Sequence, residues 1–123
     1  MRRLLVLSAV LAVSPVSQAA DVAAGKARAE AVCAACHGAA GVSVSDGIPH
    51  LAGQRAAYLE GQLKAFKEGT RKNPMMNAIA AQLGAEDIAN VAAHFAGQPG
   101  AALTLYKEVA AAVHNAALML EGL

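Results

Sequence analysis

The five residues from Cys33 to His37, with the sequence CAACH, constrain the fold of this chain more than any other segment. Both cysteines of the 123-residue chain lie here, separated by two alanines, and a histidine follows directly. Residues three and four apart share one face of a helical turn, so both thiols and the imidazole project to the same side. The rest of the chain has to fold around whatever these three side chains hold.

Four kinds of site contain residues of this type. A structural zinc site needs four ligands, and the other three histidines of the chain have no finger-like spacing. A thioredoxin-like dithiol needs a strand-to-helix junction, which is not legible here, and a disulfide would close only two residues and leave His37 without a role. Covalent haem uses all three side chains, with thioethers from Cys33 and Cys36 and iron ligation by His37. The motif therefore predicts one haem c per chain.

The first 19 residues have the features of an export signal. Arg2 and Arg3 form a positive start, an apolar run of about ten residues follows, and small residues precede a predicted cleavage after Ala19. The apolar run is shorter than the roughly 20 residues that span a bilayer. We therefore predict a bacterial periplasmic protein with no transmembrane anchor after the signal is removed.

Charge and aromatic content exclude one class of partner. Removal of Arg2 and Arg3 leaves eight basic residues against nine acidic ones, a net charge of about −1. Aromatic residues make up 3% of the chain, and the basic residues form no cluster. A nucleic-acid-binding surface needs positive charge and usually stacking side chains, so we expect no nucleic-acid partner.

The hydrophobic pattern predicts helices and no strands, which places the chain in the all-α class. Asp21 is suited to cap the first helix and Gly69 to end the second. Pro74 disfavours helix in the residue before it, so we expect a loop there that ends in a short helical turn. Residues 37–54, rich in glycine, serine and proline, are expected to form a long loop. The predicted helices are residues 22–36, 55–69, 85–97 and 101–123.

Two of these helices have a clear apolar face. In the segment 85–97, one face collects four apolar residues, Ile88, Val91, Ala92 and Phe95. In the last helix, most polar residues fall within about a third of the circumference, and the rest of the surface is apolar. We expect that last helix to pack on the globular part of the chain or on another chain.

Three segments together resemble class I cytochromes c, especially small bacterial periplasmic proteins with one haem and the halves of their two-haem relatives. The segments are AGKARAEAVCAACHG, IPHLAGQRAAYLEGQLKAFKEGTRKNPMM and LGAEDIANVAAHFAG. The resemblance implies four or five helices around one covalently bound haem, with the first and last family helices crossing near Gly25. It also implies a division into a signal peptide (1–19), a cytochrome c domain (20–97) and an extra C-terminal helical extension (98–123).

The resemblance further implies a second iron ligand. In the family, this ligand lies seven residues before the leucine that precedes the last family helix, and counting back from Leu83 gives Met76, with Met75 as the alternative. Pro49 matches the family proline whose carbonyl accepts a hydrogen bond from the other ring nitrogen of His37, although a simple loop turn also explains a proline there. A thioether opposite an imidazole leaves the iron no free position, which favours electron transfer over catalysis.

The implied function is that of a periplasmic carrier of one electron. Its partners would be a quinol-oxidising complex as donor and a terminal oxidase or reductase as acceptor. The alternative is a haem-binding electron-transfer subunit of a larger dehydrogenase or oxidase complex, in which the extension mediates subunit or self association. A haem peroxidase or a gas sensor is the third possibility, and it would require a vacant iron position.

Overall fold

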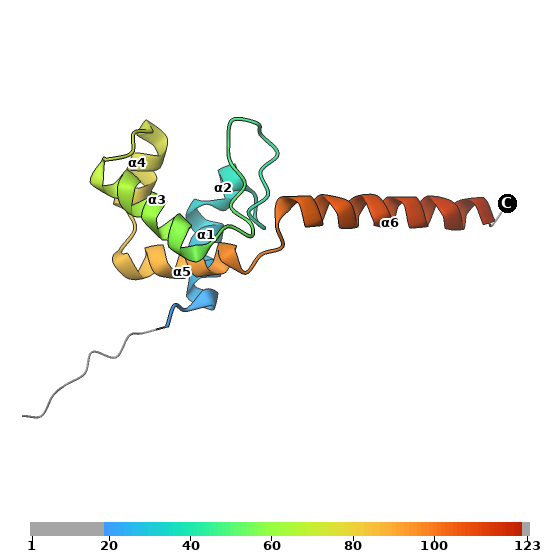
Figure 1. The fold of residues 1–123 in the computed structure, drawn as a ribbon, viewed down its shortest axis with the longest axis horizontal. Helices are drawn as coiled ribbons and strands as arrows, with labels where there is room; N and C mark the ends of the chain where they lie inside the picture. Colours follow the sequence, from blue (N-terminus) through green and yellow to red (C-terminus); the bar gives the residue numbers. More distant parts are fainter. Residues whose placement is uncertain (1–18, 122–123) are drawn as a thin grey trace, which may run out of the picture.

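A computed structural model describes residues 19–121, which form α-helices and, within that range, no strand (Figure 1). The all-α prediction is confirmed. The predicted signal peptide falls almost entirely on residues 1–18, outside the described part of the chain. None of the described helices is long and apolar enough to cross a membrane. The helices are α1 (Val22–Val32), α2 (Ala34–His37), α3 (Ala56–Glu68), α4 (Pro74–Ala81), α5 (Ala85–Ala96) and α6 (Ala101–Glu121).

Helices α1 and α5 cross in close contact, as the family resemblance implies (Figure 1). Gly25 lies at the crossing, where an added Cβ atom would be 2.0 Å from the carbonyl oxygen of Asn90. The Asp21 carboxylate caps α1 by accepting hydrogen bonds from the amides of residues 23 and 24. The Asp21 amide in turn donates to the buried Asn90 side chain at 2.7 Å. These contacts join the start of α1 to the middle of α5.

The core lies between α1, α3 and α5. All four residues predicted to share the apolar face of α5 are at most 2% exposed: Ile88, Val91, Ala92 and Phe95. Val91, Ala92 and Phe95 form one cluster with Ala29, Cys33 and Leu59. Full burial of a side chain such as Ile88 or Phe95 contributes about 1.5–3 kcal/mol, so this cluster supplies much of the stability of the globule, by which we mean residues 21–97.

The first predicted helix is interrupted. Instead of one helix over residues 22–36, α1 ends at Val32 and the four-residue helix α2 begins at Ala34. The backbone of Cys33 between them departs from helical geometry, with φ −112° and ψ −36°. Burial of the Cys33 and His37 side chains outweighs the helix propensity of the intervening alanines.

Helix α4 is longer than the predicted short turn. Asn73 is extended, as expected for a residue before proline, and its side chain accepts a hydrogen bond from the amide of Met76 at 3.0 Å. Pro74 occupies the first helical position, where its missing N–H has no partner to lose. The N-cap and the proline together therefore start a full helix of eight residues.

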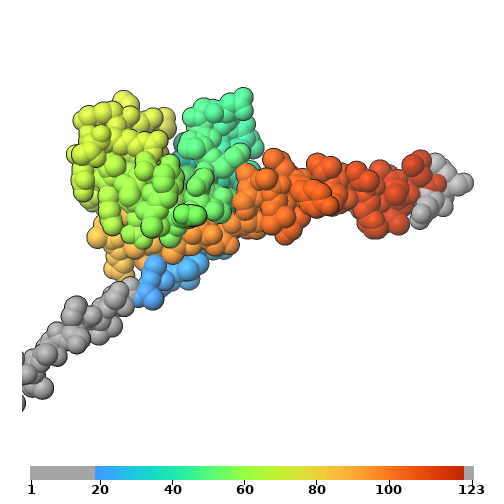
Figure 2. Space-filling model, viewed as in Figure 1, coloured from blue at the N-terminus to red at the C-terminus, as the bar shows by residue number. Residues whose placement is uncertain are grey.

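Helix α6 extends away from the globule (Figures 1 and 2). Its large apolar side chains are exposed, from 49% for Leu103 to 76% for Met119. Packing of the last helix on the globule, one of the two outcomes predicted from its sequence, is therefore wrong. The connection between Gly97 and Gly100 directs the helix outward, and the apolar residues of α1, α3 and α5 are already buried against one another.

Candidate functional site

The CAACH segment forms the turn that joins α1 to α2. Cys33 and His37 are buried, whereas Cys36 is exposed, and both cysteines are free. Burial raises the pKa of the Cys33 thiol to about 11, although the positive charge of Arg28 acts in the opposite direction. Before haem is attached, the Cys33 thiol is therefore protonated at neutral pH. Across the described residues 19–121, no three or more histidine, cysteine or acidic side chains gather as ligands for a metal ion.

The ring of His37 is held by the loop that follows it. Nδ1 lies 2.9 Å from the carbonyl oxygen of Pro49, so the Nδ1–H group donates and the lone pair resides on Nε2. An imidazole with this tautomer and a fixed orientation is the form that ligates a metal, and the carbonyl increases its donor strength. Pro49 thus makes the contact that the sequence analysis expected of it.

Three backbone contacts shape the loop between His37 and α3. Gly38 has φ +81°, and a Cβ there would lie 2.2 Å from the carbonyl oxygen of Val42. The carbonyl of Gly41 accepts hydrogen bonds from the amides of residues 51 and 52 at 2.8 and 3.0 Å. The amide of residue 53 donates to the Phe95 carbonyl at 2.9 Å, which fastens the loop to α5. The position of the Pro49 carbonyl is therefore set by the whole loop.

His50 has a structural role that sequence reasoning missed. The sequence indicates no function for it, and its side chain is exposed in the structure. Its Nδ1 nevertheless accepts a hydrogen bond from the amide of Ser43 at 2.9 Å. Because His50 directly follows Pro49 in the chain, this bond helps to hold the Pro49 carbonyl in place. No spacing or propensity in the sequence indicates this contact, because it depends on how the loop folds back.

Met76 lies on α4, and Asn77 fixes the approach to that helix. The Asn77 amide donates to the carbonyls of Phe66 at 2.6 Å and Arg71 at 2.9 Å. Its oxygen accepts from the amide of Asn73 at 2.9 Å. One side chain thus ties the end of α3, the connecting loop and the start of α4 together, and the sequence analysis overlooked it. Met75 is 64% exposed, whereas Met76 is partly buried.

Figure 2 shows a notch between two parts of the globule. One part holds α3 and α4, and the other holds α2 and the loop that follows it (Figures 1 and 2). Met76 belongs to the first part and His37 to the second. The fold therefore places the two predicted iron ligands on elements that flank a crevice, as insertion of a flat ring between them requires.

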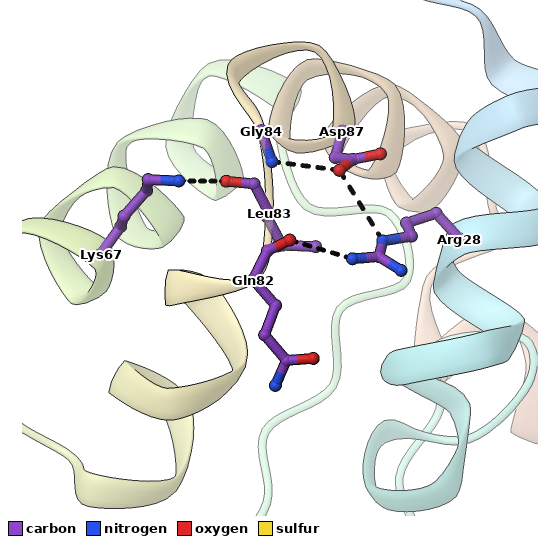
Figure 3. A network of polar contacts seen from close by, with 6 residues as sticks. All are labelled: Arg28, Lys67, Gln82, Leu83, Gly84 and Asp87. Atoms are coloured by element: carbon purple, nitrogen blue, oxygen red, sulfur yellow. Dashed lines mark hydrogen bonds and ion pairs between the residues drawn. The ribbon is translucent and has the colours of Figure 1, made fainter.

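A polar cluster fixes the turn between α4 and α5 (Figure 3). Arg28 of α1 donates to the Gln82 carbonyl at 3.0 Å, and its Nε lies 3.8 Å from the Asp87 carboxylate. Asp87 accepts from the amide of Gly84 at 3.0 Å, and Lys67 of α3 donates to the Leu83 carbonyl. Since α1 leads directly to Cys33 and α4 carries Met76, this cluster fixes the two sides of the crevice relative to each other.

His94 lies outside this arrangement. It is 4% exposed and its ring centroid is 5.1 Å from that of Phe95. It lines a shallow surface groove together with residues of α1, and its Nε2 has no hydrogen-bond partner within the described structure. A position packed against the first helix agrees with a core role for this residue.

The donor set tests whether these residues suit a covalently attached haem. Two free cysteines three residues apart, followed by a histidine whose Nε2 is available, match the requirement for two thioethers and one axial ligand. An all-α fold that carries this turn beside a crevice is that of a class I cytochrome c domain.

Comparison with known proteins gives the family. Residues 20–95 match the family described as cytochrome c oxidase, cbb3-type, subunit III. The chain is 46% identical over 80 residues to cytochrome c4 of Pseudomonas aeruginosa, which covers 65% of this chain and 39% of that protein. It is 41% identical over 83 residues to cytochrome c-554(548) of Halomonas halodenitrificans, covering 65% of this chain and 99% of that one. The chain belongs to this family of c-type cytochromes.

Solved structures of relatives support the same assignment. Cytochrome c4 of Acidithiobacillus ferrooxidans has a TM-score of 0.59 and 35% identity, over 68% of this chain and 52% of that one. Cytochrome c4 of Pseudomonas stutzeri has a TM-score of 0.56 and 33% identity, over 65% of this chain and 50% of that one. The chain thus spans about half or less of the cytochromes c4 it matches. Membership of this family of c-type cytochromes means that the chain carries covalently bound haem c.

Proposed function

We propose that the protein is a periplasmic carrier of one electron, with a haem iron held between His37 and Met76. The observation that carries this proposal is the 2.9 Å contact between His37 Nδ1 and the Pro49 carbonyl, which leaves Nε2 as the metal-binding nitrogen. Met76 is favoured over Met75 because it lies partly buried on α4, whereas Met75 is 64% exposed.

Each residue has a separate task in this proposal. Cys33 and Cys36 would hold the haem through thioethers, and His37 and Met76 would ligate its iron. The bound haem supplies an iron that changes between the ferric and ferrous states. A thioether ligand favours the ferrous state more than a second imidazole does, so Met76 raises the reduction potential. With His37 and Met76 as ligands, the iron would have no position left for a substrate.

The surroundings of the ligands favour transfer with little rearrangement. The loop contacts to Gly41 and Phe95 hold the Pro49 carbonyl, and Asn77 holds the start of α4. Both ligands therefore keep their positions when the charge of the iron changes. Transfer to partners would occur across a small and short-lived interface, which is typical of redox proteins.

The partners of the proposed carrier are a quinol-oxidising complex as donor and a terminal oxidase or reductase as acceptor. A second role is supported by one relative, the thiosulfate dehydrogenase electron acceptor of Stutzerimonas stutzeri. The chain is 46% identical to it over 67 residues, which cover 52% of this chain and 31% of that protein. A position next to a dehydrogenase, as an electron-transfer subunit or acceptor, is therefore the alternative.

Spectra of the purified exported protein test the ligands. We expect the weak red absorption band of sulfur-ligated ferric haem in the wild type, its loss in Met76→Ala, and its retention in the matched control Met75→Ala. The mass of the same wild-type preparation should equal residues 20–123 plus one haem. A band that survives in Met76→Ala and disappears in Met75→Ala would reassign the ligand, and a colourless protein would contradict the proposal altogether.

A further inference from the structure

Helix α6 presents an exposed apolar surface along most of its described length, and only its start, with Leu105, lines a groove together with loop residues 40–50. It runs for 21 residues from Ala101 to Glu121 and leaves the globule directly (Figure 1). Its large apolar side chains are between 49% and 76% exposed, which is unusual for a single helix of a water-soluble domain. A surface of this kind needs a partner, and the arrangement of side chains on the helix indicates which one.

The apolar residues of α6 follow a heptad repeat. Tyr106, Val113 and Leu120 take the a positions, and Ala102, Val109 and Ala116 take the d positions. The flanking e and g positions hold only Leu, Ala and Met. The described polar residues fall on the opposite b, c and f positions: Thr104, Lys107, Glu108, His114 and Asn115. Leu118 departs from this pattern, because it takes an f position and is 53% exposed. A period of 3.5 over three heptads is the pattern of a helix that packs against another helix.

The sizes of the core residues specify the direction of the partner. In an antiparallel pair of identical helices centred on residue 111, a residues of one helix face d residues of the other. Tyr106 then faces the partner's Ala116, Leu120 faces the partner's Ala102, and Val109 faces the partner's Val113. Tyr106 and Leu120 each meet an alanine and the two valines meet each other, so the layers are filled to similar volumes. A parallel pair would instead set tyrosine against tyrosine and alanine against alanine.

We propose that α6 is a dimerisation helix that pairs antiparallel with α6 of a second copy of this chain. The six a and d residues of each helix form six layers, and the order of these layers is the same when read from either end of the pair. A two-fold interface between identical chains requires this symmetry. The large apolar side chains at a, d, e and g number seven in each copy: Leu103, Leu105, Tyr106, Val109, Val113, Met119 and Leu120.

The available area is sufficient for a specific interface. At 49–76% exposure, each of these side chains offers roughly 80 Å² of surface, so fourteen of them offer about 1,100 Å². A specific interface buries at least about 1,000 Å². A membrane surface is the weaker alternative, because amphipathic helices that bind lipid carry several basic residues on the polar face and α6 has only Lys107 there.

Pairing in this direction separates the two globules. Each globule joins the N-terminal end of its own α6, so an antiparallel pair places the globules at opposite ends of a rod about 30 Å long. The crevices of the two copies therefore stay accessible to separate redox partners. The dimer would carry two haem domains, with each haem reached from its own end.

Sedimentation of the haem-loaded protein tests the association. We expect twice the mass of one chain for the wild type, and the mass of one chain for Val113→Glu, with the dissociation constant raised more than about 100-fold by burial of a charge. The matched control is Ala111→Glu, at an f position that faces away from the seam, and it should remain dimeric. Neither position lies in the globule, so the haem spectrum of all three proteins should be identical.

A wild type that stays monomeric at millimolar concentration, or a dimer that persists in Val113→Glu, would overturn the proposal. Vesicles of anionic phospholipid provide the remaining comparison. A monomer that binds these vesicles through α6 would assign the helix to a lipid surface instead. The measurement does not depend on the identity of the iron ligands, so its failure would leave the proposed electron-transfer function unaffected.

Disulfide formation tests the direction. In the antiparallel pair, the two copies of residue 106 are about 15 Å apart along the axis, too far for a disulfide, whereas residue 106 faces the partner's residue 116. Tyr106→Cys alone should therefore not cross-link, and a mixture of Tyr106→Cys with Ala116→Cys should. Cross-linking of Tyr106→Cys to itself, with no mixed disulfide between residues 106 and 116 in the mixture, would show a parallel pair and overturn the assigned direction.

Discussion

At the scale of single residues, the crossing of α1 and α5 depends on the absence of one side chain. Gly25 has φ in the ordinary range, so its importance comes from space alone: an added Cβ would lie 2.0 Å from the Asn90 carbonyl oxygen. Nothing in the neighbouring backbone can move away cheaply, because Asn90 is buried in the middle of α5 and bound to the Asp21 amide.

We expect Gly25→Ala to destabilise the haem-loaded protein by more than about 3 kcal/mol, because the two helices would have to separate. The matched control is Gly61→Ala on α3, where an added Cβ meets nothing within 4 Å. That change should stabilise the protein by about 0.5–1 kcal/mol, since alanine favours helix more than glycine does. Thermal or denaturant unfolding measures both. Equal stabilities for the two variants would contradict the close crossing.

At the scale of secondary-structure elements, the position of the proposed Met76 ligand depends on how α4 begins. Two asparagines form hydrogen bonds at the start of α4, one within the helix and one to other elements. Asn73 caps the amide of Met76, which is a local contact within α4. Asn77 reaches back to the carbonyls of Phe66 and Arg71 and so connects α4 to α3. The second residue therefore controls where the helix lies, and the first controls how well it starts.

We expect Asn77→Ala to lower the free energy of unfolding by about 2–3 kcal/mol, because two carbonyls lose their donor. The red absorption band of the ferric protein should also weaken in this variant, since α4 becomes free to move. Asn73→Ala should cost only about 1 kcal/mol, the usual effect of losing an N-cap, and should keep the band. The absorption band and the denaturation midpoint are the two measurements. An unchanged band in Asn77→Ala would show that α4 is held by other contacts.

The cluster around Arg28 has the same function at the other end of α4. Arg28 and Lys67, from different helices, donate to consecutive carbonyls of the turn after α4, those of Gln82 and Leu83 (Figure 3). Helix α4 is thus held at both ends by residues of other helices. This explains why a helix of eight residues, too short to be stable alone, has a defined place beside the crevice.

At the scale of the whole molecule, the globule and α6 behave as separate parts. The match to the cytochrome family ends at residue 95, and α6 begins at Ala101. The side chains of α6 are largely exposed, so the helix contributes little to the core. If the chain divides between residues 97 and 98, removal of α6 should leave the stability of the globule unchanged.

We expect a chain that ends after Gly100 to keep the haem spectrum and the thermal midpoint of the full-length protein, measured at concentrations where both are monomeric. Its self-association should be lost. Sedimentation and thermal unfolding of the two haem-loaded proteins provide the comparison. A midpoint lowered by more than a few degrees would show that α6 contributes to the stability of the globule and would contradict this division.

The haem-attachment turn could be predicted from the sequence because its chemistry is local. The spacing of Cys33, Cys36 and His37 already fixes three side chains on one turn, whatever the rest of the chain does. The N-cap at Asp21, the end of α3 at Gly69 and the apolar face of α5 are equally local, and the structure confirms them. The Pro49 contact could be expected only from a family resemblance, since Pro49 lies twelve positions after His37 in an irregular loop.

The sequence by itself determined the helical class, the attachment turn and the broad apolar face of α6, because each depends on residues within one or two turns of each other. Only the tertiary structure decided the break at Cys33, the length of α4, the clamps formed by Asn77 and Arg28, and the outward course of α6. Each of these depends on contacts between residues distant in the chain, where burial and hydrogen bonding across elements outweigh local propensity.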